Sequence, residues 1–267
     1  MKLLIQHQTI YEYTWPVLYS IQHVRLTPQQ VGHQKVLAWH VRTPGKASQS
    51  VDHFGNTVMT FSVNGQHSEI CVASQGTIEI ETLTDGYLPQ EKSAANPLVF
   101  QAFTPLTQAN AEMRDFSSFV ADHKMSFKHR VLALANVVAD RVAYTTGSTT
   151  VADSAQQAFD NGQGVCQDHS HVMLACLRAH GIAARYVSGY YYNPNAATHD
   201  SHAWVEAFDP NLQQWVGIDA THRAWVDEKH CKTAVAKDFT GASPVRGIRT
   251  GGGKERMQSQ VSIARID

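Results

Sequence analysis

The first part of the chain alternates apolar and polar residues over several short runs. These runs are LLIQHQTIYEYTW, VLAWHVRT, TVMTFSVNG and EICVASQGTIEIETL, the last ending at Leu83. A period of two places successive side chains on opposite faces of a strand. Gly, Pro, Asn and Asp stand between the runs, and Gly55-Asn56 is typical of a short hairpin turn. The pattern predicts an N-terminal antiparallel β-sandwich module over residues 1–90.

The alternation stops beyond Leu88. The segment up to Pro105 is rich in Pro and Asn and lacks periodicity, which indicates a connection between domains. Apolar residues at helical spacing follow in ANAEMRDFSSFVADH, SFKHRVLALANVVADRVAYT, ADSAQQAFDNG and VCQDHSHVMLACLRAHG. We expect Ser126 and Asp153 to be the N-caps of the second and third of these helices. Gly181 is expected just after the last residue of the fourth.

Three strand-like runs complete the pattern of the second half. They are ARYVSGYYY, SHAWVEAFD and QQWVGIDAT, separated by the turn-rich segments NPNAATHD and PNLQ. Helices followed by strands are typical of an α+β fold rather than of alternating βαβ units. The chain is therefore predicted to be α+β, with a second domain over residues 91–267.

The composition of the chain limits which kinds of partner and which cellular compartment are expected. The 267 residues include 22 basic and 23 acidic ones, a net charge of -1, so no global charge steers the chain toward nucleic acid or an anionic membrane. No run approaches the roughly 18 apolar residues of a membrane span. The N-terminal apolar run is too short for a secretory signal, so the cytoplasm is the expected compartment. We expect a small-molecule or protein partner, with the oligomeric state left open.

Among the residue types that carry reactive groups, cysteine provides the clearest candidate for a catalytic residue. The four cysteines are widely spaced and form no C-x-x-C pair, which argues against a disulfide framework and against a zinc ribbon. Cys166, in GQGVCQDHSHVM, falls at the first turn of a predicted helix, where the helix dipole favours a thiolate. Unpaired backbone N–H groups at the same helix end can hold an oxyanion. Cys166 is therefore the candidate nucleophile.

A nucleophilic thiol also needs a base. His169 and His171 lie on the same predicted helix as Cys166, and helical geometry turns His171 away from the thiol; we expect both at the helix surface or the rim of a cleft. A base on a facing strand is held more rigidly. His202 begins SHAWVEAF, and Asp219 ends the strand WVGID. If these strands pair, the carboxylate orients one imidazole nitrogen while the other faces the thiol.

The same segments resemble a known family. GQGVCQDHSHVMLACLRAHGIAARYVSGYYY, SHAWVEAF, QWVGIDATH and KDFTGASPVRGI are similar to the core of bacterial transglutaminase-like cysteine enzymes, and YTWPV, RLTP and DHFGN are similar to the β-rich module that precedes this core. The resemblance implies a papain-like core with Cys166 as nucleophile, His202 as general base and acid, and Asp219 as orienting carboxylate. It implies a peptide or protein amide as substrate and no cofactor.

Several alternatives stay open at this point. A zinc site could use Cys166, His169, His171 and His199, although their spacing fits one helix face poorly. A non-catalytic binding or scaffold protein could keep the same fold. Asp168 is expected to be a first-turn carboxylate favoured by the helix dipole, with a supporting role near the site as the other possibility.

The remaining predictions concern the other cysteines and the reaction itself. Cys176 is expected in the core and Cys231 at the surface. The sequence leaves open whether water or an amine accepts the acyl group.

Overall fold

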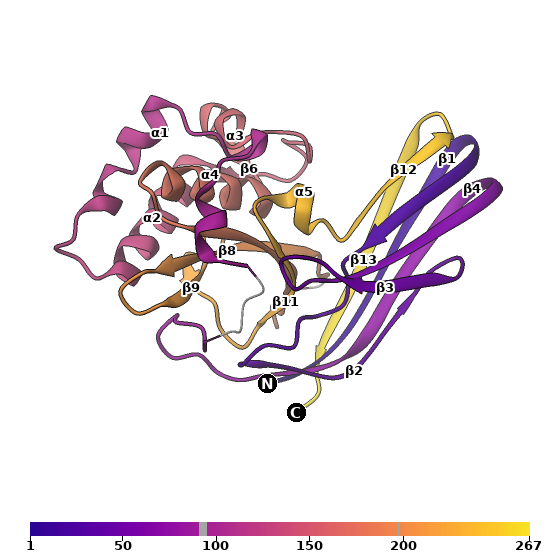
Figure 1. Ribbon diagram of the computed structural model, residues 1–267, viewed down its shortest axis with the longest axis horizontal. Coiled ribbons are helices and arrows are strands. Elements are labelled where there is room, and N and C mark those ends of the chain that lie inside the picture. The colour runs from indigo at the N-terminus through magenta and orange to yellow at the C-terminus, as the bar shows by residue number, and fades with distance from the viewer. Residues whose placement is uncertain (91–94, 197) are drawn as a thin grey trace.

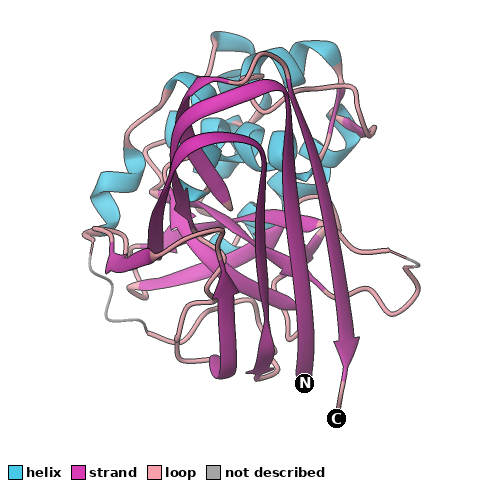
Figure 2. Cartoon of the chain, turned by 90° about the vertical axis from the view of Figure 1, so that its right-hand side faces the viewer, coloured by secondary structure: helices cyan, strands magenta, loops and turns pink. Residues whose placement is uncertain are grey.

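The structure is a computed structural model that describes residues 1–90, 95–196 and 198–267. Two parts of the fold stand side by side: a layer of helices over a sheet, and a module of long strands (Figure 1). The two ends of the chain lie together at the base of the strand module (Figures 1 and 2), where the N-terminal ammonium is 3.9 Å from an Asp267 carboxylate oxygen.

The strand module is one six-stranded antiparallel sheet whose longest strands arch over at one end (Figure 2). Strands β1 (Lys2–Val24) and β4 (Thr57–Ile80) pair over almost their whole length, with register shifts between Glu12 and Val17. Strand β2 (Gln34–Arg42) pairs with the second half of β4, and β3 (Ala47–Val51) pairs with its first half. The predicted β-rich N-terminal module is confirmed.

The arch turns one face of this sheet inward. Leu3 and Ile5, from the first half of β1, share a buried cluster with Val24, from its second half, and with Phe61 and Ile70 of β4. Apolar side chains at alternate positions of β1 and β4 therefore meet in one core, as the alternation in the sequence requires.

The C-terminal segment completes this sheet. Strand β12 (Val245–Gly251) pairs with the second half of β1, and β13 (Glu255–Arg265) pairs with its first half. Gly251, Gly252 and Gly253 join them with φ angles of 85°, 94° and 63°, a region that favours glycine. The predicted domain boundary at residue 90 assigns every later residue to the second domain. The six-stranded sheet, however, contains strands from both the N-terminal and the C-terminal segments of the chain.

The second part is a five-stranded antiparallel sheet in the order β10-β9-β8-β7-β11, covered by helices. Helix α4 contacts β7 and β8, and α2 contacts α4 and β9. Their buried faces form the largest apolar cluster, which includes Leu134, Leu174 and Val205. The elements are η1 (Pro97–Gln101), η2 (Pro105–Thr107), α1 (Ala111–Phe116), η3 (Ser118–Ala121), α2 (Phe127–Arg141), β5 (Ala143–Tyr144), α3 (Ala155–Asn161), β6 (Gln163–Gly164), α4 (Cys166–Ala179), β7 (Ala184–Tyr191), β8 (Ser201–Asp209), β9 (Gln214–Asp219), β10 (Ala224–Trp225), β11 (His230–Ala236) and α5 (Phe239–Ala242).

Helix α2 ends at Arg141, before the predicted helical segment does, and two other differences from the predicted helices have a local cause. The predicted helix around Ala111 is broken into α1 and η3 at Ser117, whose hydroxyl donates to the Met113 carbonyl. Helix α3 is capped by Ser154 and not by Asp153, because the Ser154 hydroxyl accepts from the Gln157 N–H in a capping box. Asp153 instead accepts from the preceding turn.

The connection from Leu88 to Pro105 includes the 3-10 turn η1 and ends where η2 begins, and residues 91–94 of it lie outside the described residues. None of the helices in the described ranges is long and apolar enough to cross a membrane.

Candidate active site

Cys166 is the first residue of α4, as the sequence predicts. Its side chain is partly exposed. Just before it, β6 pairs with β5 in a short parallel ladder. Gly164 lies against Asp168: a Cβ on this glycine would come within 2.6 Å of the Asp168 Cβ. The approach of strand to helix is therefore close enough to require glycine.

Asp168 holds the start of α4 in place. Its Oδ2 accepts hydrogen bonds from the Val165 N–H at 2.8 Å and from the Thr149 hydroxyl at 2.7 Å. Burial raises the pKa of Asp168, against the opposing effect of these hydrogen bonds. Its carboxylate thus satisfies the N-terminus of the helix that carries Cys166.

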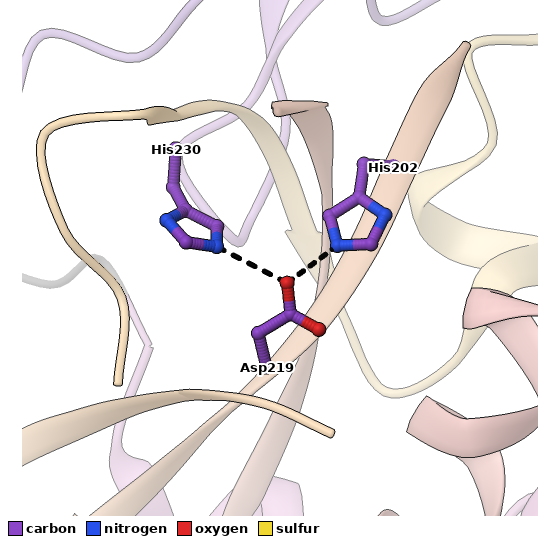
Figure 3. A group of neighbouring side chains, drawn as sticks. All are labelled: His202, Asp219 and His230. Carbon is purple, nitrogen blue, oxygen red and sulfur yellow. Dashed lines mark hydrogen bonds and ion pairs between the residues drawn. The ribbon is translucent and has the colours of Figure 1, made fainter. Parts of the chain in front are cut away.

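His202 and Asp219 meet across neighbouring strands (Figure 3). Strands β8 and β9 pair antiparallel, with Val205 opposite Ile218, the residue before Asp219. This register brings Nε2 of His202 to 2.6 Å from Oδ2 of Asp219. His202 and Cys166 line the same cavity, and the Cys166 side chain contributes to the raised pKa of His202. The structure therefore brings the three predicted site residues together from α4, β8 and β9.

Each member of the His202–Asp219 pair favours the charged form of the other, the imidazolium and the carboxylate. Burial alone lowers the pKa of His202, but the nearby Asp219 carboxylate outweighs it and raises that pKa to about 10. The Asp219 side chain is fully buried, which by itself raises the pKa of a carboxyl group. Its imidazole neighbours reverse this and hold the pKa well below its usual range.

Two further histidines contact the same carboxylate, and the sequence analysis missed both. His222 Nδ1 lies 2.6 Å and His230 Nε2 lies 3.1 Å from Oδ2 of Asp219. Figure 3 shows the His230 and His202 rings on either side of the carboxylate. His230 also contacts Asp227 through Nδ1, at 2.8 Å. His222 follows Asp219 by three residues, a spacing visible in GIDATH, whereas His230 starts β11, which only the fold brings near.

A cavity of about 540 Å³ opens over Cys166 and His202. One wall comes from the helical part and from β8. The opposite wall comes from the strand module, including both ends of the chain: the β1 residues His7, Thr9, Tyr11 and Tyr13, the β12 residues Val245, Gly247, Ile248 and Arg249, and the β13 residues Glu255, Met257 and Ser259. The strand module thus forms part of the candidate active site.

The remaining histidines of the Cys166 segment lie in the interior. His169 and His171 were expected at the surface or a cleft rim, but both are buried. His169 Nδ1 contacts the Thr221 hydroxyl and its Nε2 the Val142 carbonyl, while His171 Nε2 accepts from the Phe239 N–H. Helix α4 is covered on several sides by α2, α3, β7 and β8, so the faces that carry His169 and His171 are not exposed to solvent.

These placements also bear on metal binding. The imidazoles of His169 and His171 are engaged with protein groups and do not converge on Cys166. Among the described residues, the group of metal-ligating atoms close enough to share an ion is His202, Asp219 and His230, whose atoms lie within 4.8 Å of one another.

The other cysteines divide as follows. Cys176 is buried among the apolar residues of α4, as predicted. Cys231 was expected at the surface, which is wrong: it is fully buried on β11, against the core of the strand module, and burial raises the pKa of its thiol.

Comparison with known proteins matches both parts of the chain to protein families. Residues 3–79 match the bacterial transglutaminase-like N-terminal region, and residues 116–220 match the transglutaminase-like superfamily. The chain therefore carries a transglutaminase-like core preceded by a bacterial transglutaminase-like N-terminal region.

Similar proteins cover either the whole chain or the core alone. An uncharacterized protein of Mycobacterium leprae is 29% identical over 99% of this chain and 99% of its own length. An uncharacterized protein of Mycobacterium tuberculosis is 28% identical over 91% of this chain and 86% of its own. A protein-glutamine gamma-glutamyltransferase of Pseudomonas aeruginosa is 34% identical over 103 residues, which are 34% of this chain and 15% of that protein.

The whole fold is also found in a solved structure. The crystal structure described as a "Putative Cysteine Protease from Cytophaga hutchinsonii" has a TM-score of 0.79 and 20% identity, over 100% of this chain and 91% of that one. The likeness shows that the strand module and the core occur together in the same fold.

Proposed function

We propose that this chain, which joins a transglutaminase-like core to a bacterial transglutaminase-like N-terminal region, is an enzyme that transfers or hydrolyses acyl groups at amide bonds through Cys166. The observation that carries the proposal is the 2.6 Å contact of His202 with Asp219 at a cavity that Cys166 also lines. A thiol at a helix N-terminus, an imidazole beside it and a carboxylate behind the imidazole are the parts of a cysteine nucleophile with its base.

The proposed reaction begins with attack of the Cys166 thiolate on an amide carbonyl carbon. Backbone N–H groups in the first turn of α4 stabilise the oxyanion. His202 then protonates the leaving amine through Nδ1, while Asp219 holds Nε2 and stabilises the imidazolium. Expulsion of the amine leaves a thioester on Cys166.

The acceptor completes the reaction. Water as acceptor makes the enzyme a peptidase or amidase, and an amine makes it a transglutaminase. In either case a proton of the acceptor passes to His202 as the new bond to carbon forms and the bond to sulfur breaks. A peptide or protein amide as substrate and the cytoplasm as compartment stay predictions from the sequence.

A direct test is trapping of the acyl-enzyme from a peptide library, read by mass spectrometry of the intact protein. We expect an adduct on the wild-type chain and none on Cys166→Ala. Cys71→Ala is the matched control, since Cys71 is also partly exposed but lies on β4, away from the cavity. An adduct that survives Cys166→Ala would contradict the proposed nucleophile.

The competing function is a binding or scaffold protein that keeps the fold without the reaction. The two are separated by the rate of iodoacetamide alkylation of Cys166 across pH. An enzyme with an imidazole-paired thiolate gives a rate that falls sharply in His202→Ala. Alkylation of Cys166 at the same rate in both proteins favours the scaffold.

A further inference from the structure

A second cavity, of about 530 Å³, lies at the end of α4 opposite to Cys166. His180, which follows the last residue of α4, lines this cavity, and so does Phe208 near the end of β8. Cys166 and His202, at the starts of the same two elements, line the cavity described above. Helix α4 has 14 residues and is therefore about 20 Å long. The two cavities have no described lining residue in common, so they are separate sites.

The walls of the second cavity combine apolar surface with one permanent positive charge. Phe127 and Ile182 line it, and Leu98 lines it while 63% exposed, so the free protein presents apolar surface there. Arg130 also lines it, and an arginine side chain stays protonated in proteins. No aspartate or glutamate occurs among the described lining residues. The cavity is therefore suited to an apolar molecule that carries a negative charge.

Arg130 is buried without an anionic partner. The residue is 4% exposed, its Nη1 donates to the Val120 carbonyl, and its guanidinium carbon lies 5.5 Å from the centre of the Phe127 ring. In the part of the chain that the structure describes, Nε has no hydrogen-bond partner and no carboxylate forms an ion pair with Arg130. Nε and Nη2 form one of the two edges with which arginine holds a carboxylate. Because buried charges in proteins are normally paired, an anion from solution is the expected partner.

We propose that this cavity binds a small monocarboxylic acid with an apolar body, whose carboxylate accepts hydrogen bonds from Arg130 and whose body packs against Phe127 and Ile182. A single permanent charge favours a ligand with a single negative charge, and the apolar walls disfavour a small, strongly hydrated inorganic anion. The volume lies within the range of about 300–1,000 Å³ that is usual for small-molecule sites. Binding here involves no reaction at Cys166, so the proposal is independent of the proposed function.

The first test compares ligands on the full-length wild-type chain by calorimetry, with octanoate as the probe. We expect one octanoate per chain. Octanol keeps the apolar body without the charge, and acetate keeps the carboxylate without the body; both should bind at least about tenfold more weakly. Equal affinity for octanoate and octanol would overturn the role of the carboxylate. Tighter binding of octyl phosphate than of octanoate would overturn the choice of a carboxylic acid in favour of a phosphate ester.

The second test changes the cavity wall. Arg130→Gln removes the charge and should weaken octanoate binding at least about tenfold, whereas Arg130→Lys keeps the charge without the planar edge and should be intermediate. Circular dichroism melts identify a variant that has not folded. Leu98→Asp keeps the test decisive in that case, because it adds a negative charge at an exposed position of the wall and should also weaken binding. Leu37→Asp is its control, since Leu37 is 43% exposed on β2 and lines neither cavity. Unchanged octanoate affinity in the folded wall variants would overturn the site.

Methyl NMR of the isoleucines locates the bound octanoate. Ile182 lines the proposed cavity and Ile248 lines the cavity over Cys166, and the variants Ile182→Val and Ile248→Val assign their signals. We expect octanoate to shift the Ile182 methyl signal and to leave that of Ile248 unchanged. A shift of the Ile248 signal alone would place octanoate in the candidate active site and overturn the proposal. Absence of acyl-transfer activity would leave this result standing, just as failure to bind octanoate would leave the proposed function standing.

Discussion

Nε2 of His202 lies 2.6 Å from Oδ2 of Asp219, and each group changes the ionisation of the other. The carboxylate raises the pKa of the imidazole to about 10 despite its burial, and the imidazoles hold the pKa of the carboxyl well below its usual range despite the complete burial of Asp219. A buried pair of this kind persists because neither partner is tolerated as an isolated charge. The pair is therefore the electrostatic centre of the candidate active site.

Asp219→Asn is expected to lower kcat by roughly 10²–10⁴-fold, because the amide neither selects the His202 tautomer nor stabilises the imidazolium. The measurement is steady-state turnover of a substrate found by acyl-enzyme trapping. Asp209→Asn is the matched control, since Asp209 is a buried carboxylate of β8 bonded to the Tyr87 hydroxyl at 2.8 Å. Equal losses in the two variants would point to a general effect of removing a buried charge.

The strand module is expected to contribute to substrate binding. Ile248 and Met257 line the cavity from β12 and β13, yet the two residues are 71% and 57% exposed, so they contribute little to the stability of the free protein. Truncation to alanine is expected to raise KM several-fold with little change in kcat or in the free energy of unfolding, because the contact is made with substrate. Kinetics of Ile248→Ala and Met257→Ala test this.

Leu18→Ala is the control for this experiment. Leu18 is 53% exposed on β1 but does not line the cavity. If KM rises equally in Leu18→Ala, the effect comes from the surface of the sheet in general, and the proposed role of the cavity wall is wrong.

Stability is expected to fall as the solution is acidified from about pH 6.5 to about pH 4. Burial lowers the pKa of His7 and of His171 to about 4 from 6.5. Below pH 6.5 the unfolded chain binds protons at these positions and the folded chain does not, so the loss begins at the unfolded value and ends at the folded one. Each histidine can account for up to about 3 kcal/mol.

The contribution of His171 can be isolated by urea unfolding at pH 7.5 and pH 4.5. His171→Gln removes the titrating group and keeps an acceptor for the Phe239 N–H. Its free energy of unfolding is expected to fall less on acidification than that of the wild type, whereas exposed His123→Gln behaves like the wild type. Identical acid dependence in wild type and His171→Gln contradicts the assignment.

Glu206 is expected to be a stability determinant of the five-stranded sheet. Its carboxylate contacts Arg185 and Lys232, with all three side chains at most 2% exposed. Glu206→Gln leaves two buried cations with a weakened partner, so the free energy of unfolding should fall by about 3–5 kcal/mol. Glu79→Gln is the control, since the Lys2–Glu79 pair is exposed and should change stability by less than about 1 kcal/mol.

Local sequence patterns were sufficient to predict most helices and strands and to identify which single residues could act as nucleophile, base and carboxylate. The alternation of β1 and β4 and the helical spacing of α2 and α4 identify these elements because burial imposes a period of two on a half-buried strand and of 3.6 on a helix. The helix start at Cys166 and the strands carrying His202 and Asp219 follow from the same patterns. The resemblance to transglutaminase-like enzymes adds the expectation that these three residues act together.

Only the tertiary structure decided what surrounds them. The register of β8 and β9 places Asp219 beside His202. His230, from β11, and His222, three residues after Asp219, contact the same carboxylate, which therefore lies against three imidazoles. The C-terminal strands β12 and β13 return to β1 and form a wall of the cavity over Cys166. Sequence periodicity reports whether a side chain is buried, because burial is a property of one element. It does not report which distant element buries it, because pairing between strands far apart in the chain depends on the whole core.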